Sequence, residues 1–137
     1  MRFMMMMYPG ITDEDWMPDP EAFGQMSAYN EELAQAGVLL ALDGLHPGGS
    51  AAHVTVKDGK KTITDGPFAE AKEVVGGYWI IQAKTREEAV EWASRVPIGE
   101  GPRVELRQIF EISDFPQEVQ DAARLSETPP GQSVESQ

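Results

Sequence analysis

The sequence contains no cysteine, which excludes disulfide bonds and thiolate chemistry. It is also poor in cations, because 11 Lys and Arg stand against 23 Asp and Glu, for a net charge of −12. A surface of this sign repels nucleic-acid phosphates and anionic lipids, so we expect neither as a direct partner. No stretch approaches the roughly 20 apolar residues that cross a bilayer. The run Met4 to Met7 is too short for a signal peptide, and Pro9 and Gly10 end it. The absence of cysteine fits a cytoplasmic protein, which we expect.

The 137 residues, 41% of them hydrophobic, suffice for the core of one domain. Residues 113–137 differ from the rest, with five acidic residues and one basic residue. Phe115 to Leu125 is predicted to form a short helix, and the polar composition beyond Ser126 is typical of disorder. We therefore expect a folded domain over residues 1–112 and an acidic tail over 113–137.

Two strands and a helix are predicted in the first third of the chain. Residues 2–8 and 38–42 are apolar runs that suit strands. Asp19 is a candidate helix cap followed by Pro20 at the first helical position, and Gly37 is a candidate left-handed end. The predicted apolar side of this helix carries Phe23, Met26, Asn30, Leu33 and Ala34.

A hairpin and a second helix are predicted in the remainder. Residues 53–57 and 60–64 flank Asp58-Gly59, a strong signal for a two-residue hairpin turn. Residues 76–83 and 103–112 read as strands. Thr85 and Glu88 form a capping box before a helix that Pro97 ends.

The predicted order is β-α-β, a hairpin, then β-α-β, which is the order of a ferredoxin-like α+β fold with an antiparallel sheet. Two helices cover only one face of such a sheet. The other face would carry methionines of the first strand and Tyr78 or Trp79. We therefore predict a homodimer in which two sheets pack face to face.

The stretch TDGPFAEAKEVVGGYWII, from Thr64 to Ile81, is distinctive. Together with VKDGKKTITDGPF and AGVLLALDGLHP before it, it resembles the YCII-related family, specifically the DGPF-domain branch. The similarity covers roughly residues 1–112. It implies a dimeric α/β barrel of ferredoxin-like subunits and a small-molecule pocket between helix and sheet or at the dimer seam.

The resemblance also implies functions without fixing one. Some relatives are linked to the breakdown of aromatic compounds, and DGPF relatives often accompany sigma factors of the extracytoplasmic-function type. Members outside the DGPF branch resemble enzymes with a His–Asp dyad whose His lies on the first helix. That position falls near Met26 here, and methionine cannot carry protons.

The candidate catalytic residues are Asp65 and His46. Asp65 suits a turn, where its side chain bonds nearby backbone N–H groups, and equally a proton shuttle at a strand end. His46 lies in a Gly/Pro loop, and histidine is the side chain most often used as a general acid or base. His46 and His53 show no metal-ligand spacing, so we expect no metal and no cofactor.

The candidate substrate-binding residues are Met26, Lys72, Tyr78 and Arg107. Lys72, with Glu70 and Glu73, is either part of a solvated charge run or the partner of a buried carboxylate. Arg107 either holds a substrate carboxylate or makes an ordinary ion pair. Tyr78 either packs in the core or dimer seam or lines an aromatic pocket. Gly76-Gly77 indicates close backbone approach, a bulge or room for a ligand rather than a nucleotide loop.

Three functional hypotheses follow. The first is a cofactor-independent enzyme of the lyase or isomerase type that moves a proton on a small acidic or aromatic compound. The second is a ligand-binding or regulatory module of a sigma-factor system, with the acidic tail available to a basic protein partner. The third is a structural dimer with a vestigial pocket.

Overall fold

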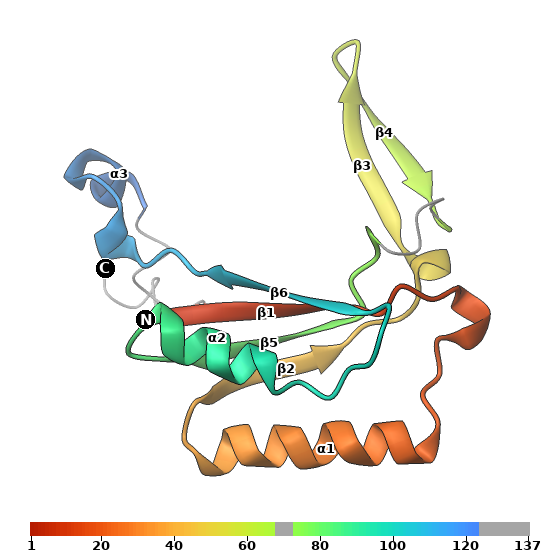
Figure 1. Ribbon diagram of the computed structural model, residues 1–137. Coiled ribbons are helices and arrows are strands. Elements are labelled where there is room, and N and C mark those ends of the chain that lie inside the picture. The colour runs from red at the N-terminus through yellow and green to blue at the C-terminus, as the bar shows by residue number, and fades with distance from the viewer. Residues whose placement is uncertain (68–72, 124–137) are drawn as a thin grey trace, which may run out of the picture.

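The computed structural model describes residues 1–67 and 73–123 (Figure 1). Its longer elements are β1 (Arg2–Tyr8), α1 (Pro20–Gln35), β2 (Leu39–Gly44), β3 (Ala52–Lys57), β4 (Lys60–Asp65), β5 (Gly77–Gln82), α2 (Arg86–Ser94) and β6 (Arg103–Gln108). Short helical turns are η1 (Asp13–Asp15), η2 (Gly48–Ser50) and η4 (Ile112–Asp114), and the six-residue α3 is Gln117–Ala122. The predicted element order and α+β class are confirmed.

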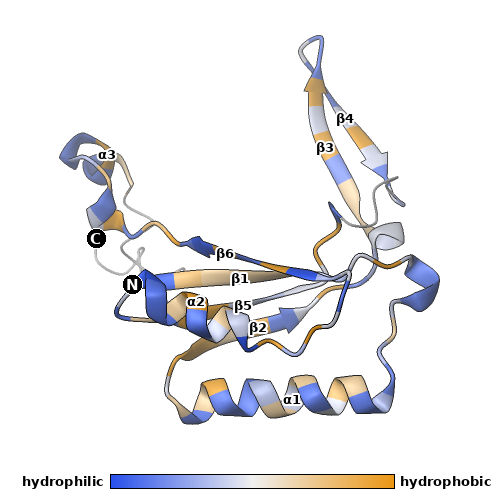
Figure 2. Cartoon of the chain, in the orientation of Figure 1, coloured by the Kyte–Doolittle hydropathy of each residue, from blue (hydrophilic) through white to orange (hydrophobic). Residues whose placement is uncertain are grey.

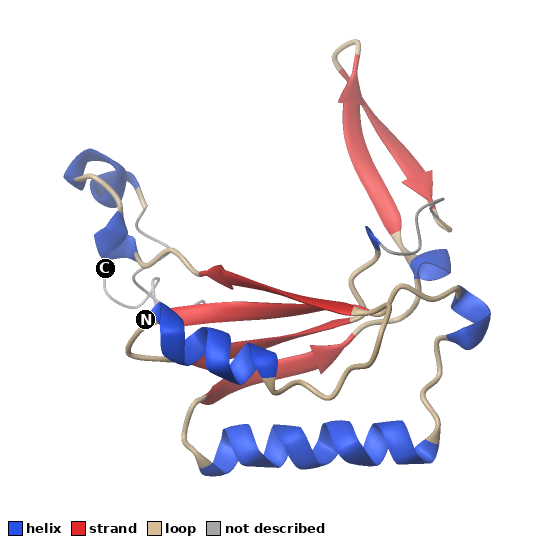
Figure 3. Ribbon diagram, in the orientation of Figure 1, coloured by secondary structure: helices blue, strands red, loops and turns tan. Residues whose placement is uncertain are grey.

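Two sheets make up the β-structure (Figure 3). The main sheet has the order β2-β5-β1-β6, and every neighbouring pair is antiparallel. This is the ferredoxin-like arrangement, with the first strand in the interior of the sheet. Among the residues that the structure describes, strands β3 and β4 pair only with each other and form a separate hairpin.

The helix ends follow the sequence signals closely. Asp19 Oδ1 accepts a hydrogen bond from the Ala22 N–H at 2.7 Å, and Gly37 has the left-handed φ of 74° that its C-terminal position requires. Thr85 Oγ1 accepts from the Glu88 N–H at 3.1 Å, as predicted. The Glu88 carboxylate accepts from Lys84, one residue earlier than the N-cap that a capping box uses.

The hydrophobic core lies between α1, α2 and one face of the main sheet. Its most buried members include Phe3, Met5, Leu33 and Ile81. The prediction that Phe23 belongs to the buried side of α1 is wrong, because Phe23 is 64% exposed. The side chains that α1 packs into the core are Met26, Tyr29 and Leu33, all later along the helix.

The last strand is shorter than predicted. It ends at Gln108 rather than Ile112, so the in-and-out alternation stops there. Phe110, expected on the apolar face of this strand, is 68% exposed and stacks on Phe115 with ring centroids 4.7 Å apart. The chain turns away from the sheet at this point, which takes the aromatic pair out of the core.

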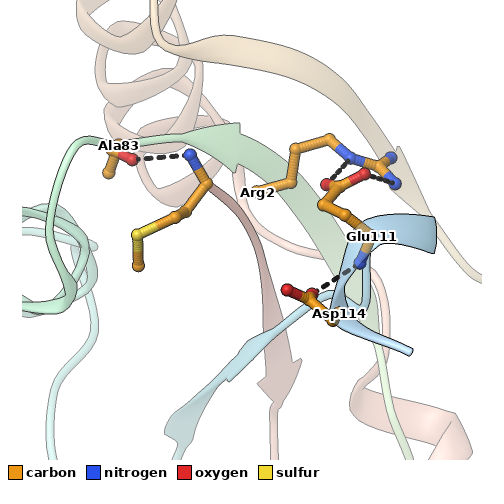
Figure 4. Close-up of polar contacts among 5 residues, drawn as sticks. Arg2, Ala83, Glu111 and Asp114 are labelled. Atoms are coloured by element: carbon orange, nitrogen blue, oxygen red, sulfur yellow. Dashed lines mark hydrogen bonds and ion pairs between the residues drawn. The ribbon is translucent and has the colours of Figure 1, made fainter. Parts of the chain in front are cut away.

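The segment after β6 is anchored to the N-terminus of the chain (Figure 4). Arg2 Nε donates to Glu111 Oε1 at 2.6 Å, and the Glu111 N–H donates to Asp114 Oδ2 at 2.8 Å. The Arg2 hydrogen bond lowers the pKa of Glu111. The Met1 ammonium group donates to the Ala83 carbonyl at 3.1 Å. The Arg2–Glu111 contact holds the start of residues 111–123 at one end of the sheet, and the Met1–Ala83 contact fixes the N-terminus beside it.

The second face of the main sheet is left uncovered by α1 and α2. The cross-strand register forms two rows of side chains on it: Arg107–Met4–Ile80–Ala41 and Glu105–Met6–Tyr78–Asp43. The inner strands supply Met4, Ile80, Met6 and Tyr78, and charged residues lie at the edges of the rows. Figure 2 shows the ribbon of β1 coloured mainly as hydrophobic. We call these two rows the uncovered face.

One strand of this face contains a bulge. Leu39 pairs with Ile81, whereas Ala41 pairs with Ile80, so the register shifts by one residue at Leu40. From Ala41 onwards β2 therefore shows its odd-numbered side chains to the uncovered face.

Tyr29 is expected to make stability fall at high pH. Its hydroxyl donates to the Trp92 carbonyl at 2.6 Å, and burial raises the pKa of Tyr29 to about 12. Because an unfolded tyrosine ionises near pH 10, the contribution of Tyr29 is complete below pH 10 and is lost as pH rises to about 12. We expect a loss of about 2 kcal/mol over this window in urea titrations. A Tyr29→Phe variant should lack this dependence, and an unchanged slope in that variant would contradict the assignment.

Candidate functional site

A tyrosine–carboxylate pair stands at one end of the uncovered face. Tyr78 Oη on β5 donates to Asp43 Oδ2 on β2 at 2.7 Å, and both residues are reached from the open side of the sheet. The hydrogen bond to Asp43 raises the pKa of Tyr78, so the phenol keeps its proton at neutral pH. The second carboxylate oxygen of Asp43 and the open apolar row beside it could receive a small molecule.

Backbone packing explains why β2 and β5 meet closely here. A Cβ atom at Gly77 would lie 3.0 Å from the Asp43 carbonyl oxygen, and one at Gly76 would lie 2.9 Å from the Pro9 ring. A larger residue at Gly77 would push β5 away from β2, and one at Gly76 would displace the Pro9 ring. The predicted close backbone approach is therefore confirmed at Gly77.

The loop that carries His46 is held against the same end of the sheet. The Leu45 N–H donates to the Gly76 carbonyl at 2.9 Å, and Trp16 Nε1 donates to the Leu45 carbonyl at 3.0 Å. Asp13 Oδ2 accepts from the Gly49 N–H at 2.9 Å. These bonds fix the backbone on either side of His46, whose side chain is exposed.

Asp65 lies at the base of the hairpin, near this end of the sheet. It is the last residue of β4, opposite Ala52, rather than part of a turn. The next residue, Gly66, donates its N–H to the Ala51 carbonyl at 2.8 Å and packs against Gly48. Asp65 and His46 thus flank the same small loop, although both are exposed.

The other candidates are spread over the molecule. Arg107 lies on the uncovered face, on the edge strand opposite β2, next to Met4. Met26 packs against the core on the opposite side of the sheet, so it cannot share a site with Tyr78. Lys72 and Glu70 lie outside the described residues. Glu73 forms an ion pair with Arg103 at 3.6 Å.

The part of the chain that the structure describes contains neither a metal-binding cluster nor a membrane-spanning helix. Within residues 1–67 and 73–123, no three His, Asp or Glu side chains gather as metal ligands. No helix in those same ranges is long and apolar enough to cross a bilayer.

Comparison with known proteins assigns most of the chain to a family. The model of the YCII-related domain matches residues 1–113. The chain belongs to the YCII-related family. A protein of Rhizobium meliloti (strain 1021), described only as uncharacterised, is 32% identical over 75 residues. That match covers 55% of this chain and 60% of the relative.

Asp43 is the residue of this YCII-related protein that sequence reasoning missed. The sequence did offer a signal, because Asp43 directly follows the apolar strand LLAL and precedes a glycine. A carboxylate at the end of a strand is often placed for binding or chemistry. The contact that makes Asp43 a candidate, with Tyr78, depends on the β2 bulge and on strand order.

A cavity of about 250 Å³ lies at the other end of the YCII-related domain and is lined by Gln108, Ile109, Phe110 and Asp114. None of the predicted site residues borders it. It adjoins Phe110, which stacks on Phe115, and Gln108 and Asp114 add polar groups to its lining.

Proposed function

We propose that this YCII-related protein, of the DGPF-domain type, is a cofactor-independent enzyme of the lyase or isomerase class. It would move a proton on a small acidic or aromatic compound held on the uncovered face. The observation that supports this proposal is the Tyr78–Asp43 hydrogen bond of 2.7 Å beside an apolar row. A carboxylate oriented by a neighbouring donor is a typical general base.

The side chains around the pair suit distinct roles. Asp43 would take the proton, and Tyr78 would orient the carboxylate through its hydroxyl. Met6 and Ile80 would contact the apolar part of the compound. Arg107 lies two strands from Tyr78 and one row further along, in the row of Ile80, which is roughly 12 Å at the usual strand geometry. Its long guanidinium side chain would hold the anionic end of a small acid.

Asp65 and His46 remain proposed proton carriers at the same end of the domain. Their positions, on either side of the loop braced by Trp16, suit a second acid or base that reaches a bound compound from the rim. Substituting Asp65 and His46 one at a time would show whether either contributes to proton transfer separately from Asp43.

The enzyme would work as a homodimer, because a second copy on the uncovered face would exclude water from the pair. We expect Ile80→Asp, which places a charge in the apolar row, to convert a dimer into a monomer in light scattering at micromolar concentration. Val90→Asp on α2, where Val90 is 39% exposed, is the matched control and should leave the mass unchanged. A wild-type monomer would rule out the dimer.

The proposed activity can be tested without knowing the natural substrate. The protein is incubated in D₂O with a panel of small 2-oxo, enol and aromatic carboxylic acids, and exchange of C–H for C–D is followed by NMR. We expect catalysed exchange for at least one class of acid. If several acids raise the melting temperature but none exchanges, the chain binds without catalysing proton transfer.

A ligand-binding or regulatory module is the second candidate, linked to an extracytoplasmic-function sigma-factor system. It is favoured by the absence of any buried charged or polar residue among those that the structure describes. Enzymes more often bury their acid–base groups. Melting-temperature shifts without exchange, together with a protein partner recovered through residues 113–137, would support this module.

A further inference from the structure

The hairpin β3–β4 is an exposed arm. All twelve residues of its two strands are exposed, and it belongs to neither layer of the domain. In Figure 1 it rises from one end of the main sheet, on the side away from α1. An isolated two-stranded hairpin is marginal in water, so a hairpin of this kind needs a surface to pack against.

One face of the arm is apolar. Val54 pairs directly with Ile63, and Val56 lies on the same face two residue pairs nearer the tip, opposite Lys61. These three side chains are 62%, 70% and 68% exposed, respectively. The opposite face carries Thr55 and Thr62, which are polar. The arm therefore has one side suited to a protein contact.

The tip of the arm is basic in an otherwise acidic protein. Lys57, Lys60 and Lys61 surround the turn, with Asp58 as the only acid there. The whole chain has a net charge of −12 and only 11 Lys and Arg. A second copy of this chain is thus a charge-complementary partner for the tip.

The complementary surface is the segment after β6. In Figure 1, α3 lies at the other end of the sheet, also on the side away from α1. Residues 110–121 contain no Lys or Arg and carry Glu111, Asp114, Glu118 and Asp121. They also expose apolar side chains, with Phe110 at 68% and Val119 at 43%. Acidic and apolar groups here match the basic and apolar groups of the arm.

The dimensions allow the contact in a two-fold dimer. Six-residue strands are about 20 Å long, whereas packed sheets lie about 10 Å apart, so the arm reaches past the plane of a partner sheet. A two-fold axis across the strands places the arm of one copy at the α3 end of the other. The contact then occurs twice, because each copy supplies one arm and one acidic segment.

We infer that the hairpin β3–β4 is a dimerisation arm that packs its Val54/Val56/Ile63 face and lysine tip against residues 110–121 of a second copy. The cavity of about 250 Å³ beside Phe110 offers room for an arm side chain. This inference rests on the homodimer proposed above, and it does not depend on the proposed proton transfer.

A charge swap tests the arm directly. One variant carries Lys57→Glu, Lys60→Glu and Lys61→Glu, and a second carries Glu118→Lys and Asp121→Lys. Each variant alone places like charges at both contacts, so we expect the dimer Kd to rise about tenfold. An equimolar mixture of the two restores attraction at both contacts and should return the Kd to within about threefold of wild type. Sedimentation equilibrium at about 0.1 M salt measures each value.

A matched control separates the effect of the arm–α3 contact on the dimer Kd from the effect of net charge. It carries Glu31→Lys and Glu91→Lys on the exposed sides of α1 and α2, and so has the same net charge as the α3 variant. Its mixture with the arm variant should bind more weakly than the arm–α3 mixture. Equal binding of the two mixtures, or unchanged Kd values for the single variants, would overturn the arm but leave the homodimer. A wild-type monomer would overturn both.

Discussion

Trp79→Ala is expected to lower the free energy of unfolding by about 4 kcal/mol. Trp79 is 5% exposed, and its ring meets the Tyr29 ring edge-on with centroids 5.9 Å apart. Its Nε1 donates to Asn30 Oδ1 at 2.7 Å. Truncation would leave a cavity between the sheet and α1 and would remove the donor for Asn30. Because small domains are stable by only about 5–15 kcal/mol, much of the total would be lost.

Urea denaturation followed by circular dichroism measures this effect. Met17→Ala is the control, because Met17 is 84% exposed and its truncation should change stability by less than about 0.5 kcal/mol. Trp79→Phe should cost less than Trp79→Ala, since a phenyl ring fills most of the space but leaves Asn30 without its partner. A cost below about 1 kcal/mol for Trp79→Ala would contradict this description of the core.

Asp43→Asn is expected to lower the rate of catalysed deuterium exchange by about a hundredfold, the usual contribution of a general base. The amide has the size of the carboxylate and can still accept a hydrogen bond from Tyr78, so the fold should be retained. It cannot take a proton at neutral pH. Tyr78→Phe should cost less, about tenfold, because the carboxylate remains but loses its orienting donor.

The comparison with Asp65 decides which carboxylate is the base. Asp65→Asn and His46→Gln are measured in the same assay, with Glu87→Gln on the helix side as the control. If Asp65→Asn abolishes exchange and Asp43→Asn does not, the base is at the hairpin rim and the roles proposed for the Tyr78–Asp43 pair are wrong. All variants should show wild-type melting temperatures to within a few degrees.

The elements of the fold could be predicted from sequence because their signals are local. Asp19-Pro20 starts α1, Gly37 follows it, and Asp58-Gly59 makes the hairpin turn, where both residues have positive φ. Each of these signals acts within a few residues, so no tertiary information is needed.

The candidate site could be predicted only in part, because its contacts join distant segments. Tyr78 was a candidate from sequence, but its partner Asp43 is 35 residues away in the chain and lies on the neighbouring strand. The exposure of Phe110 likewise depends on where β6 leaves the sheet. The alternation of apolar and polar residues in the sequence cannot show where a strand leaves its sheet.

The bulge at Leu40 has a consequence for how this site is encoded. With uninterrupted pairing from Leu39 opposite Ile81, Asp43 would share the side of Leu39 and point toward the helices, where an unpaired carboxylate is costly. One extra residue in β2 moves the side chains that follow it to the opposite face of the sheet, so the Asp43 carboxylate meets Tyr78. The position of the Asp43 carboxylate therefore depends on the number of residues in β2 as well as on their identity. Deleting Leu40 would make the strand regular and keep Ala41 opposite Ile80 and Asp43 opposite Tyr78, whereas a regular strand that retained all six residues would turn the carboxylate toward the helices.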